Sequence, residues 1–198
     1  MSHVRALLAC WLIALVSCAS DGGQRGTGIT VAEGNIVSAQ MADIEVSVEG
    51  TDLHTTADAD GRFSLRGDFA GDTALHFEAP GIGVSARLPV NAPAGGSLNL
   101  HDVTLDAATD TARAATTEVA FEGSVVSLAC DENRIGLMSV HHAAADTDTY
   151  VVTLDDSVLH DGQGRPIACT DLQSGDDLDV HGFFADDGTI GKADVTRH

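Results

Sequence analysis

Apolar and polar residues alternate along most of this chain, in short runs bounded by turn-forming residues. Every second residue of a strand lies on the same face of a sheet, so such runs are typical of strands with one buried face. Gly, Asp and Pro cluster between the runs, as they do in tight turns. In the first half of the chain the runs are Ile44–Val48, Phe63–Leu65, Leu75–Phe77, Val84–Val90 and Leu98–Leu105. The pattern predicts an all-β protein built from short antiparallel strands.

Three motifs in this half resemble those of a known family. They are Gly34-x-Ile36-Val37, Val46-x-Val48-x-Gly50 and the ten-residue stretch TADADGRFSL at Thr56–Leu65. On these motifs, residues 29–106 resemble the carboxypeptidase regulatory-like domains, relatives of the transthyretin-like and collagen-adhesin B-type domains. The resemblance implies a prealbumin-like Greek-key β-sandwich. Some adhesin relatives carry a Lys–Asn isopeptide cross-link, which is excluded here because this segment contains no Lys.

The second half of the chain predicts five more strands, at 119–128, 135–140, 150–154, 177–184 and 189–196. A short turn or helix is expected at 169–173. The stretches 171–182 and 186–195, together with Phe121-x-Gly123-x-Val125, look like a family of bacterial envelope domains, the domain of unknown function numbered five-six-six-six. That resemblance implies a small five-stranded OB-like β-barrel over residues 118–198. Residues 107–117, rich in Ala, Thr and Asp, are predicted to be an interdomain linker or a short helix.

The N-terminal segment has the form of a secretory signal peptide, in which Arg5 precedes an apolar run too short to span a bilayer. The run ends in Leu15-Val16-Ser17-Cys18, which resembles the lipobox of bacterial lipoproteins. This resemblance implies that residues 1–17 are removed and that Cys18 carries the lipid. The composition from Ser20 to Gly28, with no periodic apolar residue, predicts that residues 18–28 form a flexible tether. Because Ala19 follows the cysteine, the protein is expected to be located in the outer membrane. Cleavage after Ala19 is the alternative, and it would release a soluble secreted protein.

Cysteine usage fits an oxidising compartment. Of four cysteines, Cys10 leaves with the signal peptide and Cys18 is the lipid site, so Cys130 and Cys169 remain to form one disulfide. Two unpaired buried thiols are the alternative.

Charge and aromatic content exclude several functions. The formal net charge of −20 argues against nucleic acids and anionic membrane surfaces as partners. Aromatic residues make up only 4% of the chain, too few for a glycan-stacking surface. The motifs Gly-x-Ser-x-Gly, Ser-x-x-Lys and His-Glu-x-x-His do not occur in the sequence. We therefore expect a non-catalytic structural or protein-interaction module without a cofactor.

Side chains that could bind a metal are numerous but do not form a recognisable metal-binding motif in the sequence. The densest group, His141, His142, Asp146 and Asp148, is a weak candidate, because its loop composition favours a solvated segment over an ordered metal site. The sequence Asp58-x-Asp60-Gly61 resembles part of a calcium loop but lacks the closing Glu, and we expect a hairpin turn. With 30 acidic residues, the alternative function is binding of a cation such as calcium, or of a cationic peptide.

Overall fold

The structure is a computed structural model that describes residues 28–37, 43–79, 81, 83–142 and 148–198. Fourteen strands join into one mixed sheet, and the described residues contain no α-helix. No helix among them has the length and apolar character that crossing a membrane requires. The predicted all-β class is thus confirmed. The expected signal peptide, Cys18 and residues 19–27 of the expected tether lie outside the described residues.

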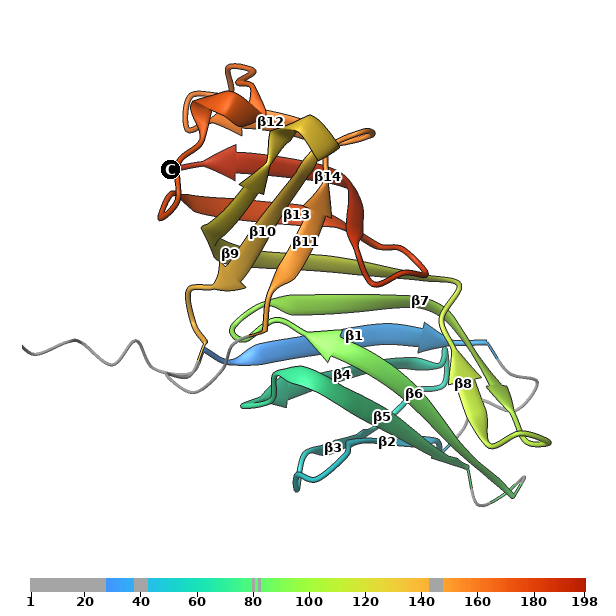
Figure 1. Ribbon diagram of the computed structural model, residues 1–198. Helices are drawn as coiled ribbons and strands as arrows, with labels where there is room; N and C mark the ends of the chain where they lie inside the picture. Colours follow the sequence, from blue (N-terminus) through green and yellow to red (C-terminus); the bar gives the residue numbers. More distant parts are fainter. Residues whose placement is uncertain (1–27, 38–42, 80, 82, 143–147) are drawn as a thin grey trace, which may run out of the picture.

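The first eight strands form two rows that pack against each other (Figure 1). One row has the order β4–β1–β7 and the other β3–β2–β5–β6–β8; they meet where β7 pairs with β8. Phe63 of β4 and Phe77 of β5 contact edge to face between the rows, with ring centroids 5.7 Å apart. The bounds are β1 (Thr30–Ile36), β2 (Glu45–Val48), β3 (His54–Thr56), β4 (Arg62–Gly67), β5 (Gly71–Ala79), β6 (Val84–Ala92), β7 (Ser97–Asp106) and β8 (Thr111–Arg113).

Two pairings in this part depart from the antiparallel expectation: β6 and β8 are parallel at a single residue pair, and β1 runs parallel to β7 along most of its length. Parallel neighbours need a long connection, and the strands from β2 to β6 supply it. Gly34 of β1 is tightly enclosed by its two neighbours in the same row, β7 and β4. A Cβ atom at Gly34 would come within 2.6 Å of the Leu100 carbonyl oxygen and 2.8 Å of the Phe63 ring.

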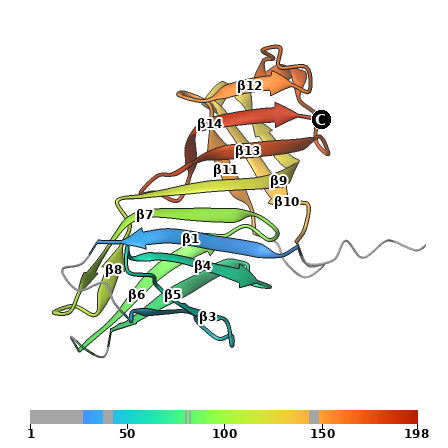
Figure 2. The same cartoon turned by 180° about the vertical axis from the view of Figure 1, so that it is seen from behind.

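Five of the last six strands pair in a closed ring with the order β9–β10–β11–β14–β13–β9. Only the β11–β14 pairing in this ring is parallel. The remaining strand, β12, pairs with β14 outside the ring (Figure 2). All five predicted strands of this half are present, whereas β12 was not predicted. The bounds are β9 (Thr116–Ala129), β10 (Arg134–Ser139), β11 (Tyr150–Thr153), β12 (Val158–Asp161), β13 (Asp177–Phe184) and β14 (Ile190–Arg197).

The two groups of strands share one hydrophobic core and one sheet. Buried residues from β1 to β14 form a single contiguous cluster, and β7 pairs antiparallel with β9. Residues 107–117, where the sequence predicts a linker, comprise a turn, the strand β8 and the start of β9. Ala112 of β8 is buried and paired with Leu105 of β7. The connection is therefore part of the sheet, and the short helix considered for it does not form.

A second contact joins the two groups at the end of β10. The hydroxyl of Ser139 donates to the Ala94 carbonyl at 2.6 Å, and the hydroxyl of Tyr150 donates to the Ala92 carbonyl at 3.1 Å. Ser139 and Tyr150 are both buried. Two buried side chains of the C-terminal strands thus satisfy backbone carbonyls at the end of β6 and just beyond it, which fixes one group of strands against the other.

The predicted disulfide is present. Cys130 begins the 3-10 helix η2 (Cys130–Glu132) after β9, and Cys169 begins η3 (Cys169–Asp171) before β13. Their Cα atoms are 5.6 Å apart, within the range that a disulfide spans. The bond closes a loop with a sequence separation of 39 residues around the ring of strands.

Candidate functional site

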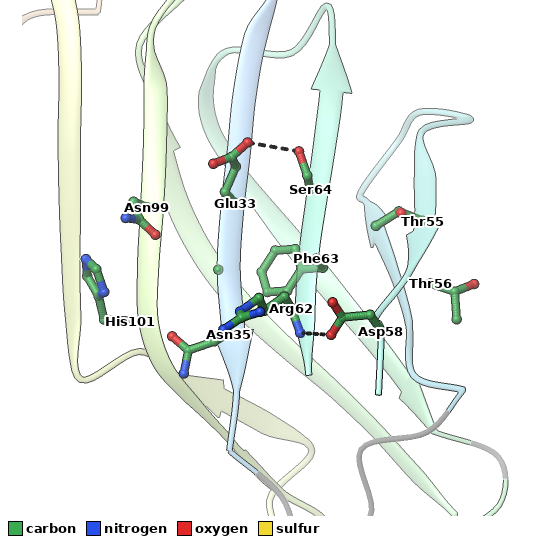
Figure 3. A pocket seen from close by; sticks show the side chains of 11 residues that line it. Glu33, Asn35, Thr55, Thr56, Asp58, Arg62, Phe63, Ser64, Asn99 and His101 are labelled. Carbon is green, nitrogen blue, oxygen red and sulfur yellow. Dashed lines mark hydrogen bonds between the residues drawn. The ribbon is translucent and has the colours of Figure 1, made fainter. Parts of the chain in front are cut away.

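A shallow open groove of about 570 Å³ crosses the outer face of β7, β1 and β4 and turns around the edge of β4 toward β3 (Figure 3). Alternation places polar side chains on this outer face while their strand neighbours fill the core. Ser64 donates a hydrogen bond to the Glu33 carboxylate at 3.1 Å across β4 and β1. The polar lining is Glu33, Asn35, Thr55, Thr56, Asp58, Arg62, Ser64, Asn99 and His101.

The β4 strand leaves one edge open beside this groove. Among the described residues, β4 pairs only with β1. The Ile36 amide donates to the Gly61 carbonyl at 2.8 Å. This bond identifies which residue pairs of the β1–β4 ladder are hydrogen-bonded, because such pairs alternate with pairs that are not. In an antiparallel ladder that alternation directs the backbone groups of Phe63 and Leu65 toward β1, and those of Ser64 and Arg66 away from it. Within the described chain, no backbone hydrogen bond reaches the outward groups of Ser64 or Arg66.

The turn before β4 closes one end of the edge. The Asp58 carboxylate accepts hydrogen bonds from the amides of Asp60 and Arg62 at 2.9 and 2.8 Å, and the Asp58 amide donates to the Arg62 carbonyl at 2.9 Å. Gly61 has a φ of 76°, which this turn requires. A tight turn is therefore present at Asp58–Gly61, but the expected hairpin is not, because the strands that it joins, β3 and β4, pair with β2 and β1 and not with each other. One oxygen of the Asp58 carboxylate serves the turn, so its role here is to hold backbone amides.

Next to the groove, Glu118 of β9 lies between two histidines. One carboxylate oxygen is 3.3 Å from Nε2 of His101 on β7, and the other is 2.7 Å from Nε2 of His181 on β13. The hydrogen bond with His101, and then the charge of His181, lower the pKa of Glu118 below its usual range despite its partial burial. A carboxylate with a lowered pKa is a weak base at neutral pH and acts as an acceptor and a negative charge.

The chemistry of this surface suits polar and cationic groups. Glu33, Asp58 and Glu118 supply carboxylates along the groove and its margin, and Arg62 is paired with Asp60 at 3.4 Å. Asn35 and Asp102 exchange two hydrogen bonds, of 2.9 and 3.1 Å, at the far end of β1. The surface thus offers oxygen acceptors above an open strand edge, an arrangement that can hold an extended peptide.

The structure does not gather the predicted metal candidates. The ring of His141 lies against Gly95, Nδ1 of His142 contacts the Ser139 carbonyl, and the Asp148 carboxylate lies beside Gly71. Asp146 is outside the described residues. In the part of the chain that the structure describes, no group of three or more His, Cys, Asp or Glu side chains is arranged so that it could hold a metal ion.

Sequence reasoning named Asp58 as a turn residue and Thr56–Leu65 as a family motif, but it predicted neither the groove nor the role of Glu118. Alternation predicts that such side chains point outward, but their assembly depends on the pairings of β1 with β4 and β7, and of β9 with β7 and β13. Comparisons with known protein families, with curated proteins and with solved structures give no match to this chain.

Proposed function

We propose that this protein is a non-catalytic, lipid-anchored module of the bacterial envelope that binds an extended, basic segment of a partner protein along β4. The two rows of β1–β8 support a sandwich of the carboxypeptidase regulatory-like class. The closed ring of β9, β10, β11, β14 and β13, with its single parallel pairing, supports an OB-like barrel. The motif ending in Cys18 supports anchoring at the outer membrane, with cleavage after Ala19 as the soluble alternative.

The observation that carries the binding proposal is the open edge of β4 beside the groove. A strand that pairs on one side only can accept a partner strand through its free amides and carbonyls. Ser64 and Arg66 supply these groups, and the groove gives space for alternate side chains of the added strand.

Charge favours a basic segment. The formal net charge is −20, and Glu33 and Asp58 line the groove. Basic side chains of a bound strand would lie near these carboxylates, and the field of the whole protein would speed their approach at low salt.

A model peptide tests this proposal. We expect an eight-residue peptide of alternating Lys and Val to bind more tightly than one of alternating Glu and Val, with an affinity that falls as salt rises. The substitution Ser64→Pro removes the outward amide without removing a bond to β1, and should weaken binding by about tenfold. The matched control Ser64→Ala keeps the amide and should bind within twofold of the wild type.

A modified peptide tests the same pairing with β4 without any change to the protein. N-methylation of alternate peptide amides removes the donors that would face β4, and should abolish binding. Equal binding of the methylated peptide, or of Ser64→Pro and Ser64→Ala, would contradict pairing with this edge. Calcium binding, the alternative, would instead raise the melting temperature in low-millimolar calcium chloride.

Anchoring needs a separate experiment. Wild type and Cys18→Ala should be compared by intact mass and membrane fractionation after expression in a bacterial host. An acyl mass and outer-membrane partitioning only in the wild type are expected. Soluble, unmodified protein in both cases would support cleavage after Ala19.

A further inference from the structure

The only lysine of the chain, Lys192, occupies a backbone conformation that lysine rarely adopts. The register between β13 and β14 shifts at Gly182, so that Lys192 and Ala193 together face one residue of β13. This bulge places Lys192 at a φ of 50°. The other described non-glycine residues with positive φ are the Asp and Asn types that tolerate it, namely Asp43, Asp102, Asp110 and Asn133.

The bulge places Lys192 at an apolar hollow of about 330 Å³. Its lining comes from the hairpin of β13 and β14 and from the first residue of β9: Thr116, Phe183, Phe184, Ala185, Gly191 and Lys192. Phe183 is 37% exposed, an unusual position for a large apolar ring in a chain with so few aromatics. The volume is at the lower end of the range for small-molecule sites.

The ammonium group of Lys192 has no acidic partner among the described residues. Lys192 forms no ion pair with any described residue, although the sequence has 30 acidic residues. The neighbouring acids have other partners: Asp194 lies 3.3 Å from Nδ1 of His160, and Asp187 accepts from the amide and hydroxyl of Thr189 at 3.0 and 2.7 Å.

We propose that this hollow binds a small amphiphilic carboxylate. The ammonium group of Lys192 pairs with the carboxylate, and the apolar part of the ligand packs against Phe183 and Phe184. An apolar lining with one unpaired cation at its margin matches a molecule with an apolar chain and one negative charge. This site is separate from the β4 groove and does not depend on the proposed partner.

The single lysine makes a direct test feasible. Reductive methylation with ¹³C-formaldehyde gives one lysine signal in the purified protein, which is distinguished from any α-amino signal by its higher pKa. On titration with sodium octanoate, we expect the Lys192 signal to shift with saturation. Octanol, which lacks the charge, and acetate, which lacks the chain, should cause only small shifts.

Substitutions then assign the roles of charge and backbone. Lys192→Asn removes the ammonium while keeping a residue that tolerates positive φ, and should weaken octanoate binding about tenfold in calorimetry. Lys192→Arg should bind within threefold of the wild type, as should the control Arg87→Asn on β6, whose exposed side chain pairs with Glu49. Phe183→Ala should also weaken binding.

Two results would overturn the proposal. One is a linear, unsaturated shift that acetate reproduces, which would mean a general ionic effect. The other is equal octanoate affinity for Lys192→Asn and the wild type when both have the same melting temperature.

Discussion

Ser139→Ala tests whether the two groups of strands are fixed to each other. The hydroxyl of Ser139 donates to the Ala94 carbonyl at 2.6 Å and accepts from the His141 amide at 3.2 Å. Ser139 is 2% exposed, so water does not readily replace the lost hydroxyl. A buried hydrogen bond contributes about 1 kcal/mol net, and leaving its partner unsatisfied costs about 1–3 kcal/mol. We expect a loss of about 2 kcal/mol in the free energy of unfolding.

The measurement is urea unfolding followed by far-UV circular dichroism, with linear extrapolation to water. Ser64→Ala is the matched control, because its hydroxyl bonds Glu33 on an exposed face and should cost less than about 0.5 kcal/mol. Tyr150→Phe, which removes the other bond across this contact, should cost about 1 kcal/mol. If Ser139→Ala stays within about 0.5 kcal/mol of the wild type, the docking of β10 on the end of β6 is refuted.

Three further substitutions have defined outcomes. Replacing Cys130 and Cys169 with Ser should cost about 4 kcal/mol by the loop-entropy relation, and reducing the wild type should shift its urea midpoint equally; an unchanged midpoint would contradict this. Gly34→Ala should cost about 1–3 kcal/mol in the same assay, because the new Cβ meets a β7 carbonyl at 2.6 Å. The Arg165 guanidinium lowers the pKa of Asp161 from 3.8 to about 2. The ionised Asp161 carboxylate therefore stabilises the folded protein above pH 3.8, and this contribution is lost as the pH falls toward 2. Melting temperatures from pH 6 to 2 should therefore converge for the wild type and Asp161→Asn, and a constant difference would contradict the prediction.

Strands were predictable from the sequence where every inward position is apolar. Val46 and Val48 of β2 are such positions, and both are buried. The inward positions of β12 are Leu159 and Asp161, so its alternation is hidden by a buried carboxylate. Asp161 is accommodated there because Arg165 and two backbone amides bond to it. The short strands β3 and β8 carry too few buried residues to give a pattern.

The groove and the Lys192 hollow could not be predicted in the same way. His101, Glu118 and His181 come from three strands, and their contact depends on the registers of β9 with β7 and with β13. Lys192 reads as an ordinary exposed residue of a strand, because a bulge is set by the offset between two strands. The alternation of apolar and polar residues predicts on which face of the sheet a side chain lies. To predict which side chains meet in a site, the register between the strands must also be known.

The position of β1 links the proposed anchor to the proposed binding edge. β1 lies between β4 and β7, antiparallel to the former and parallel to the latter. If Cys18 carries the anchor, a partner paired with β4 is held to the membrane through the β1–β4 ladder, in which six residue pairs are in register. If residues 18–28 form the tether, tension along β1 would load these pairs together in shear, and β1 would be suited to bear the load of a bound partner. Substituting Gly34 in this ladder should therefore weaken partner retention under flow more than it lowers equilibrium affinity.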